Sequence, residues 1–328
     1  MAYVTGTANH AGDLLLKLEA FLTTNPDLVA KNQAWLSLKD STAAPYNSNY
    51  TPDATGTWQL KRYFVGKGIN RTDTIVVPMA LFVNQKSSLY SLCAFPARGY
   101  DKSKGVSQQF QGVVSEDVNP VTSIPLWNNK IQYWFFANSR RFIVIAKVAS
   151  RYMSLHCGFI MPNGTDTEYP YPLYVGGSTN SEIINYQYND NVTSDGQTVG
   201  SFWNPTASRI NDKTSSGSLM MPSGQLYFAN TPYHKSVYNS RGNELWLEPY
   251  IQNINIQKTV DGQYLLMPIE FISTVNSSAS LGWLDGCYWV SGFENSPENI
   301  ITVGTDHYIC FPSMIENSVN NFCAIKME

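Results

Sequence analysis

The residues that could serve as catalytic bases are scarce in this chain. Its four histidines are His10, His156, His234 and His307. Only His307 has an adjacent carboxylate, at Asp306, and neighbouring side chains of a strand point to opposite faces. We therefore interpret this pair as structural rather than as a base with its orienting acid. Motifs of serine hydrolases, zinc peptidases and phosphate-binding loops do not occur in the sequence.

Paired carboxylates are the other candidates for chemistry, because two of them are sufficient to cleave a glycosidic bond. The local pairs are Glu116 with Asp117, Asp166 with Glu168, and Glu294 with Glu298. Each pair lies among turn-forming residues, where acidic side chains are common. We predict that the chain is not an enzyme.

The five cysteines form no CxxC pair and are widely spaced. They are Cys93, Cys157, Cys287, Cys310 and Cys323. A thiol without a neighbouring ligand behaves as a small apolar side chain, so we expect reduced and mostly buried cysteines. The sequence predicts no metal site and no cofactor.

The composition is rich in apolar residues and poor in charge. Hydrophobic residues make up 43% and charged residues 14% of the chain, against about 25% charged residues in an average soluble domain. An uncharged polar surface suits a subunit covered by its neighbours, and equally an extracellular β-protein with a neutral surface. The net charge of −3 gives no basic field for nucleic acid. The N-terminal sequence lacks the features of a secretory signal, and no apolar run is long enough for a membrane-spanning helix.

The apolar residues of 7–25 recur at helical spacing. Asn25-Pro26 ends the run, and Thr7 or Asn9 is the expected N-cap. The apolar stripe, with Leu14, Leu18 and Phe21 as candidate interface residues, packs either on a sheet of its own chain or on another subunit.

The rest of the chain reads as short strands separated by Gly, Asn, Pro and Ser, which is typical of antiparallel β-proteins. We predict a mainly β, sandwich-like fold with an N-terminal amphipathic helix. The expected organisation is a helix and first strand in 1–45, a β domain in 46–180, a loop-rich insertion in 181–240 and a C-terminal β region in 241–328. Turns are expected at Asp261-Gly262, Asp285-Gly286 and Gly304.

The most apolar stretch, 133–162, is interrupted once by Asn138-Ser139-Arg140-Arg141. It predicts strands at Ile131 to Ala137, Phe142 to Val148 and Tyr152 to Met161, with a tight turn at Asn138. Arg140 and Arg141 then lie at or beside the turn. Their guanidinium groups are expected to reach solvent, a carboxylate or a neighbouring subunit, and both are candidate interface residues.

A Pro- and Gly-rich loop follows, in which Tyr169, Tyr171 and Tyr174 are candidate anchors and interface residues. Residues 185–240 are rich in Asn, Ser, Thr and Gly, and predict long loops.

Three stretches carry a family resemblance. They are YVTGTANHAGDLLLKLEAFLT with NQAW at the start, residues 126–178 with YWFFANSRRFI and EYPYPLYVGGS, and residues 281–328 with LDGCYWVSGF. They resemble virion structural proteins of tailed bacteriophages and their prophages. Ser139 stands where that family usually has glycine, and Thr165-Asp166-Thr167 replaces its usual approach to Glu168.

The resemblance implies a component of the tail, baseplate or neck, made in the cytoplasm of a bacterial host and located in the virion. Its implied partners are other virion proteins and copies of itself, and it implies no catalytic residue and no cofactor. A second hypothesis is a binding module at the tail tip or collar. That module would contact a host surface glycan or protein through Tyr and Trp residues of 163–240.

Overall fold

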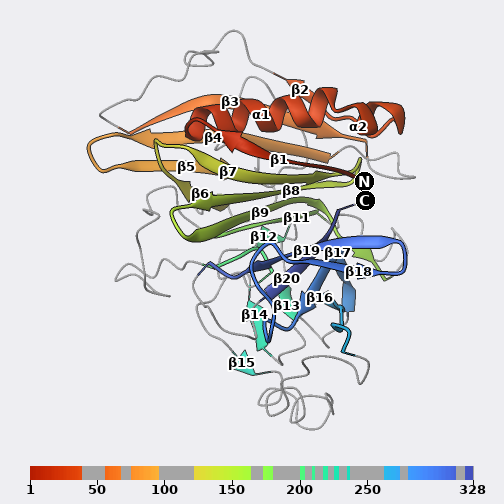
Figure 1. The fold of residues 1–328 in the computed structure, drawn as a ribbon. Coiled ribbons are helices and arrows are strands. Elements are labelled where there is room, and N and C mark those ends of the chain that lie inside the picture. Colours follow the sequence, from red (N-terminus) through yellow and green to blue (C-terminus); the bar gives the residue numbers. More distant parts are fainter. Residues whose placement is uncertain are drawn as a thin grey trace.

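The computed structural model describes residues 1–38, 56–67, 75–95, 122–163, 173–179, 200–203, 209–210, 217–220, 225–228, 235–236, 262–273, 280–314 and 322–327. They form three antiparallel sheets, which lie one above another as an upper, a central and a lower sheet (Figure 1). The predicted fold, mainly β with an amphipathic helix near the N-terminus, is confirmed.

The central sheet contains the predicted hairpin. Its strands, in spatial order, are β1 (Ala2–Ala8), β7 (Ile131–Ala137), β8 (Arg141–Val148), β9 (Arg151–Phe159), β11 (Leu173–Gly177) and β12 (Arg209–Ile210). Strands β7 and β8 pair as the predicted hairpin, and the predicted third strand, β9, pairs with β8 as a second hairpin. Strand β1 was not predicted, and it pairs with β7 along its whole length.

The upper sheet is a meander. It consists of β2 (Leu36–Leu38), β3 (Thr57–Gly66), β4 (Ile75–Asn84), β5 (Leu89–Ala94) and β6 (Thr122–Leu126). A bridge between Ser123 and Thr179 joins its last strand to the residues just after β11. The upper sheet is thereby held at the β11 side of the central sheet.

The lower sheet gathers most of the C-terminal strands. Its order is β15 (Lys235–Ser236), β14 (Gln225–Phe228), β13 (Gly217–Met220), β16 (Met267–Ser273), β17 (Ser280–Val290), β20 (Phe322–Lys326), β19 (Asp306–Pro312) and β18 (Ile300–Val303), and β10 (Met161–Pro162) also pairs with β17. The short strand β10 follows β9 directly, so the chain passes from the central to the lower sheet at Ile160.

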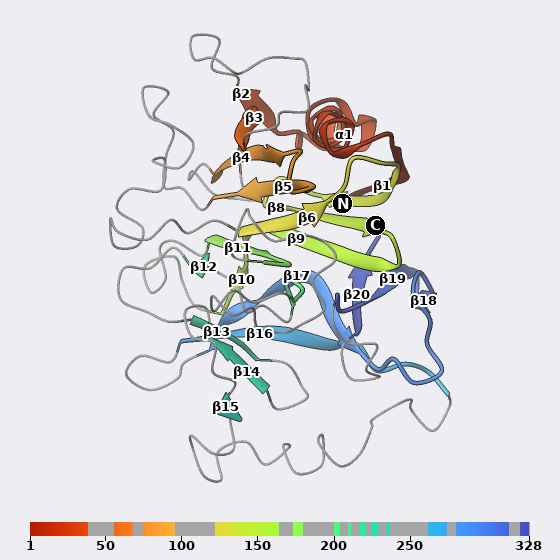
Figure 2. The same ribbon diagram turned by 90° about the vertical axis from the view of Figure 1, so that its left-hand side faces the viewer.

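Helix α1 (Ala11–Thr24) packs on its own chain. Its N-cap is His10, whose Nδ1 accepts a hydrogen bond from the backbone N–H of Asp13 at 3.2 Å, so the expected Thr7 or Asn9 cap is wrong. Leu14, Leu18 and Phe21 are buried in the core, and the helix lies beside the upper sheet and above β1 (Figure 2). A short helix α2 (Pro26–Ala30) follows, capped by Asn25.

A buried ion pair connects helix α1 with the upper sheet. The Nε of Arg62 donates to Glu19 at 2.7 Å, and the Ser37 hydroxyl donates to the other carboxylate oxygen at 2.7 Å. Both charged side chains are almost fully buried, so each depends on the other for compensation. The register of β3 and β4 shifts between Gln59 and Arg62, next to this pair.

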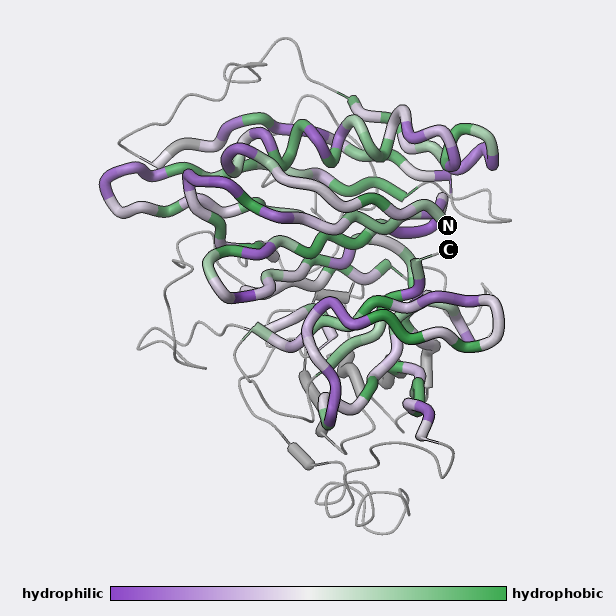
Figure 3. The backbone as a smooth tube through the Cα atoms, in the orientation of Figure 1, coloured by the Kyte–Doolittle hydropathy of each residue, from purple (hydrophilic) through white to green (hydrophobic). Residues whose placement is uncertain are grey.

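Each face of the central sheet belongs to a different core. Phe135, Phe142 and Val144 pack toward the upper sheet and helix α1. Phe136 and Ile143, which alternate with them, pack toward the lower sheet. A strand buried on both faces reads as a continuous apolar run, and the hydrophobic stretches of Figure 3 follow the central strands accordingly. This burial explains why 133–162 is the most apolar part of the sequence.

The four expected segments contribute described strands to the three sheets. From 1–45, β1 joins the central sheet while β2 joins the upper sheet. The described strands of 181–240 extend the central and lower sheets, and those of 241–328 join the lower sheet, to which β10 of 46–180 also belongs. No described helix is long and apolar enough to cross a membrane.

Candidate functional site

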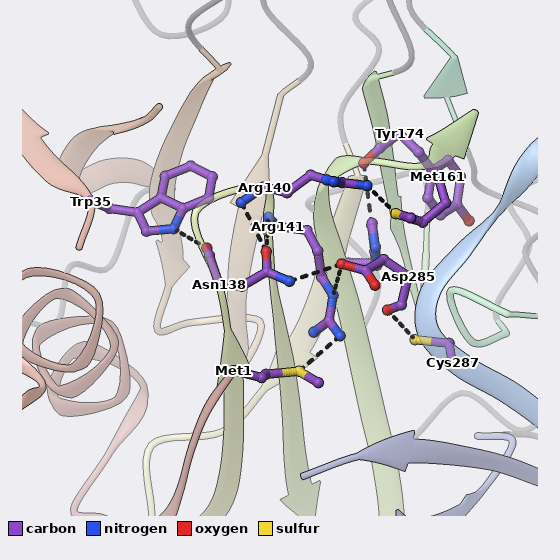
Figure 4. Close-up of polar contacts among 10 residues, drawn as sticks. Met1, Trp35, Asn138, Arg140, Arg141, Met161, Tyr174, Asp285 and Cys287 are labelled. Carbon is purple, nitrogen blue, oxygen red and sulfur yellow. Dashed lines mark hydrogen bonds and ion pairs between the residues drawn. The ribbon is translucent and has the colours of Figure 1, made fainter. Parts of the chain in front are cut away.

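The two arginines of the hairpin lie at the junction of the central and lower sheets (Figure 4). Arg141, the first residue of β8, is fully buried, and Arg140 is half-buried in the turn before it. We expected the guanidinium groups to reach solvent, a carboxylate or a neighbouring subunit. The guanidinium of Arg141 lies beside a carboxylate, that of Asp285 in β17. The expectation that its side chain leaves the apolar layer at an exposed tip is therefore corrected.

Asn138 organises the turn. Its Oδ1 accepts hydrogen bonds from the backbone N–H groups of Arg140 at 2.8 Å and Arg141 at 3.0 Å. Its side-chain amide donates to Asp285 at 2.8 Å, and its backbone carbonyl accepts from the indole N–H of Trp35 at 2.8 Å. One asparagine thus connects all three layers, because Trp35 packs with the upper sheet and Asp285 belongs to the lower sheet.

The guanidinium of Arg141 is only partly compensated. Its Nε lies 3.7 Å from Asp285 Oδ2, which is an ion pair but too long for a hydrogen bond. Its Nη2 contacts the thioether sulfur of Met1 at 3.0 Å, and its Nη1 has no hydrogen-bond partner in the part of the chain that the structure describes. Arg140 contacts the sulfur of Met161 in the same region.

Two glycines leave the space that Arg141 occupies. Gly158 lies opposite Arg141 across β8 and β9 with φ of +146°, and a Cβ there would lie 2.4 Å from the backbone oxygen of Arg140. At Gly286, with φ of +67°, a Cβ would lie 2.5 Å from Arg141 Nη2. Asp285-Gly286 is not the expected turn but lies within β17, where pairing with β16 shifts between Pro268 and Glu270. At this irregularity Gly286 adopts a positive φ. Turns require the same φ, and for this reason the Asp-Gly pair predicted a turn.

His156 lies on the same face of the central sheet as Arg141, since Gly158 is the register partner of Arg141 and alternate residues share a face. Its Nδ1 lies 3.4 Å from the carbonyl oxygen of Tyr174. Burial, and then the charge of Arg141, lower the pKa of His156 to about 3. The imidazole is therefore neutral at physiological pH and completely enclosed. We call Met1, Asn138, Arg141, His156 and Asp285 the Asp285 cluster.

Asp285 is the carboxylate of this cluster. Burial alone would raise its pKa, but the charge of Arg141 and the hydrogen bond from Asn138 outweigh burial and lower the pKa below the usual value. Asp285 is therefore ionised, and it faces a cation and an amide donor. This arrangement holds two layers together and leaves no acid or base poised for proton transfer within the cluster.

A second ion pair lies near the other end of β8. Lys147 donates to Glu298 at 2.9 Å, and the hydroxyl of Tyr152 donates to the same carboxylate oxygen at 2.6 Å. The ammonium of Lys147 also lies 4.9 Å from the centre of the Tyr152 ring. Burial would raise the pKa of Glu298, but the bonds from Tyr152 and Lys147 outweigh it and lower the pKa. Glu298 precedes β18, so this carboxylate, too, connects the lower sheet with the central one.

The adjacent Asp306 and His307 point apart, as the interpretation of the pair as structural requires. The Asp306 carboxylate accepts from Lys326 at 2.7 Å. The Nδ1 of His307 lies 3.1 Å from the Thr302 hydroxyl. The two side chains therefore have separate partners and do not form a base with its orienting acid.

The other candidate interface residues lie as follows. Leu14, Leu18 and Phe21 are buried within the chain, and so is Tyr174, whose hydroxyl donates to the carbonyl of Phe202 at 2.6 Å. These four side chains contribute to the core of the chain itself. Tyr169 and Tyr171 lie outside the described residues.

All five cysteines are buried and free, as predicted. Burial raises the pKa of Cys157 and Cys310, the latter to about 11, so these sulfurs remain protonated thiols. Within the described ranges, no three His, Cys, Asp or Glu side chains are grouped to hold a metal ion.

No protein-family model matches the chain, and no curated protein gives a match. The Asp285 cluster nevertheless relates to the sequence patterns. Each of the three stretches on which the expected resemblance rests contributes a residue to it or to its border, since Trp35 of NQAW and Asp285 of LDG both bond to Asn138 of ANSRRF. Asp285 was expected in a turn and Trp35 near a first strand, and Met1 was not singled out; none was expected at a site, because only the fold brings these residues together.

Proposed function

We propose that the chain is a non-enzymatic structural component of a tailed-phage virion, and we place it in the tail, baseplate or neck. One observation carries the proposal. Trp35 of the first stretch and Asp285 of the third, far apart in the sequence, both bond to Asn138 of the second, and Arg141 of the second forms an ion pair with Asp285. The motifs therefore lie at one junction between the sheets. This is expected when the members of a family share a fold and not an active site.

The chemistry of the junction favours a structural role over a catalytic one. Its charged groups face each other inside the protein, His156 is neutral and enclosed, and Asp285 is held ionised by Arg141. A three-layer body with two apolar cores changes shape little when neighbours bind. A surface with few charges also suits a subunit that other virion proteins and further copies cover.

The alternative of a host-binding module rests on the loops of 163–240, most of which lie outside the described residues. Among the described aromatic residues of that stretch, Tyr174 and Trp203 are buried and offer no ring face to a sugar. No observation on the described residues favours this alternative over the structural role.

The test is the composition of purified particles. Virions from a phage genome that carries this gene should contain the chain in a fixed copy number, detected by mass spectrometry after gradient purification. Cross-linking within intact particles should connect it to tail, baseplate or neck proteins. A genome with the gene deleted should give particles that are incomplete and non-infectious. Normal titre from the deletion, or particles that lack the chain, would contradict the proposal.

A further inference from the structure

Two methionine sulfurs accept hydrogen bonds from the arginines of the hairpin (Figure 4). The Nη2 of Arg141 lies 3.0 Å from the sulfur of Met1. The Nη1 of Arg140 bonds to the sulfur of Met161. A thioether sulfur is a weak acceptor, whereas the planar guanidinium forms its strongest hydrogen bonds with oxygen. At this junction charged donors therefore meet acceptors that are weaker than oxygen.

Met161 lies where the chain passes from the central to the lower sheet. It begins β10, which is only 2 residues long and pairs with Trp283 and Gly282 of β17. The hydrogen bond from Arg140 connects the turn between β7 and β8 with this short strand. A chemical change at the sulfur of Met161 therefore acts directly on the connection between the two sheets.

The two partners of this hydrogen bond can adapt to an added atom. Arg140 and Met161 are both half-buried, so solvent reaches part of each side chain. The long stem of Arg140 lets its guanidinium move back by the length of one bond. Arg141 differs, because it is fully buried, and Gly158 and Gly286 approach it too closely to leave room for a Cβ. Its guanidinium cannot follow an oxygen added to the sulfur that it contacts.

We propose that Met161 is a site of oxidation by hydrogen peroxide, and that its sulfoxide strengthens the junction through Arg140. A lone pair of the sulfur forms the new S–O bond, the O–O bond of the peroxide breaks, and water leaves after a proton moves between the two oxygens. The sulfur is oxidised and the peroxide is reduced. Methionine oxidation usually disrupts a core because it adds a polar group. Here the added oxygen meets a cation, and a charge-assisted hydrogen bond to oxygen is stronger than one to a thioether.

The test is urea unfolding of the full-length chain before and after treatment with dilute hydrogen peroxide. Mass spectrometry measures the sulfoxide at each methionine. Met161→Leu is the matched control, because it keeps an apolar side chain of similar volume and reports the effect of oxidation at the other methionines. Relative to this control, oxidation should raise the urea midpoint of the wild type.

Arg140 provides the second pair of variants. Arg140→Leu removes the donor, so oxidation should lower the urea midpoint relative to a Met161→Leu control in the same background. Arg140→Lys keeps a charged donor and should retain a rise. Circular dichroism establishes that each variant is folded, and the comparison of the wild type with Met161→Leu decides the sign by itself if Arg140→Leu does not fold.

Three results would overturn the proposal. They are a Met161 that stays unoxidised while the half-buried Met267 and Met327 are oxidised, a wild-type midpoint that does not rise relative to Met161→Leu, and an equal rise in folded Arg140→Leu. None of them bears on the virion assignment, which depends on the composition of particles.

Discussion

The side-chain amide of Asn138 donates to the carboxylate of Asp285 at 2.8 Å, across 147 positions of the sequence. The same carboxylate lies 3.7 Å from the Nε of Arg141. A turn of the central sheet and an irregular strand of the lower sheet are thus joined by one acidic group. The two arginines that interrupt the most apolar stretch mark this junction.

Asp285→Asn should destabilise the protein by about 3–5 kcal/mol, because it leaves the buried guanidinium of Arg141 without its counter-charge. Urea unfolding at pH 7 measures the loss. Asp306→Asn is the matched control at a solvent-exposed pair with Lys326, and it should cause no measurable loss. A loss below about 1 kcal/mol for Asp285→Asn would show that the junction does not depend on this charge.

His156 should make folding stability sensitive to mild acid. Its pKa is about 3 in the folded protein and 6.5 when unfolded, so the unfolded chain binds the proton more readily. The stability that the neutral imidazole of His156 contributes is fully present above pH 6.5, and it is lost as the pH falls toward 3. Between pH 7 and pH 5 the wild type should lose about 2 kcal/mol more than His156→Gln. Asp285 does not add to the change in stability between pH 7 and pH 5, because its pKa lies below the usual value of 3.8.

The measurement is urea unfolding of both proteins at several pH values between 7 and 5. Comparison of the slopes, rather than of the absolute free energies, removes any packing loss that His156→Gln causes at pH 7. Parallel pH profiles for the two proteins would mean that His156 accepts a proton in the folded state.

Local patterns were sufficient to predict the hairpins and the helix. The run of β-branched and aromatic residues, interrupted at Asn138, predicted β7 and β8 to within a residue, and the stripe containing Leu14 predicted the buried face of α1. These features depend on neighbours in the sequence. Strand β1 was missed because its hydrophobic alternation is weak, and what stabilises it is pairing with β7.

The site was predicted only in part, for a physical reason. Arg141 was recognisable as a charge in an apolar run, but its partner is determined by the packing of one sheet on another. Asp285 followed by Gly286 has the composition of a turn, and the positive φ of that glycine is the property that turns and strand irregularities share. The number of layers could not be predicted either. An apolar sequence indicates that a strand is buried on both faces, but it does not show which elements cover each face.

Gly158→Ala should be far more costly than Gly304→Ala, although both glycines have positive φ. A Cβ at Gly304 has no atom within 4 Å, so this variant carries only the backbone penalty of about 1 kcal/mol. A Cβ at Gly158 would overlap the backbone of Arg140 and Arg141, which adds about 2 kcal/mol or more. Thermal unfolding of the two variants distinguishes the backbone penalty from the additional loss of stability caused by steric overlap. Similar losses would mean that β8 and β9 can move apart without damage to the junction.

The pair of Lys147 and Glu298 should be weaker than the Asp285 cluster and should respond to salt. Both side chains are about a third exposed, so water and ions screen their attraction. A double-mutant cycle with Lys147→Met and Glu298→Gln should give a coupling free energy below about 1 kcal/mol at low salt. That coupling should shrink as sodium chloride rises from about 0.1 M to about 1 M.

The loss caused by Asp285→Asn provides the contrast for this cycle, because the Arg141 side of its ion pair is fully buried and the loss should change little over the same salt range. Tyr152→Phe extends the comparison, since it removes the hydroxyl that donates to Glu298 at 2.6 Å and leaves the ring beside Lys147. If the coupling of Lys147 and Glu298 proved large and independent of salt, both ends of β8 would hold the lower sheet equally. The layers would then separate only when both ion pairs are broken.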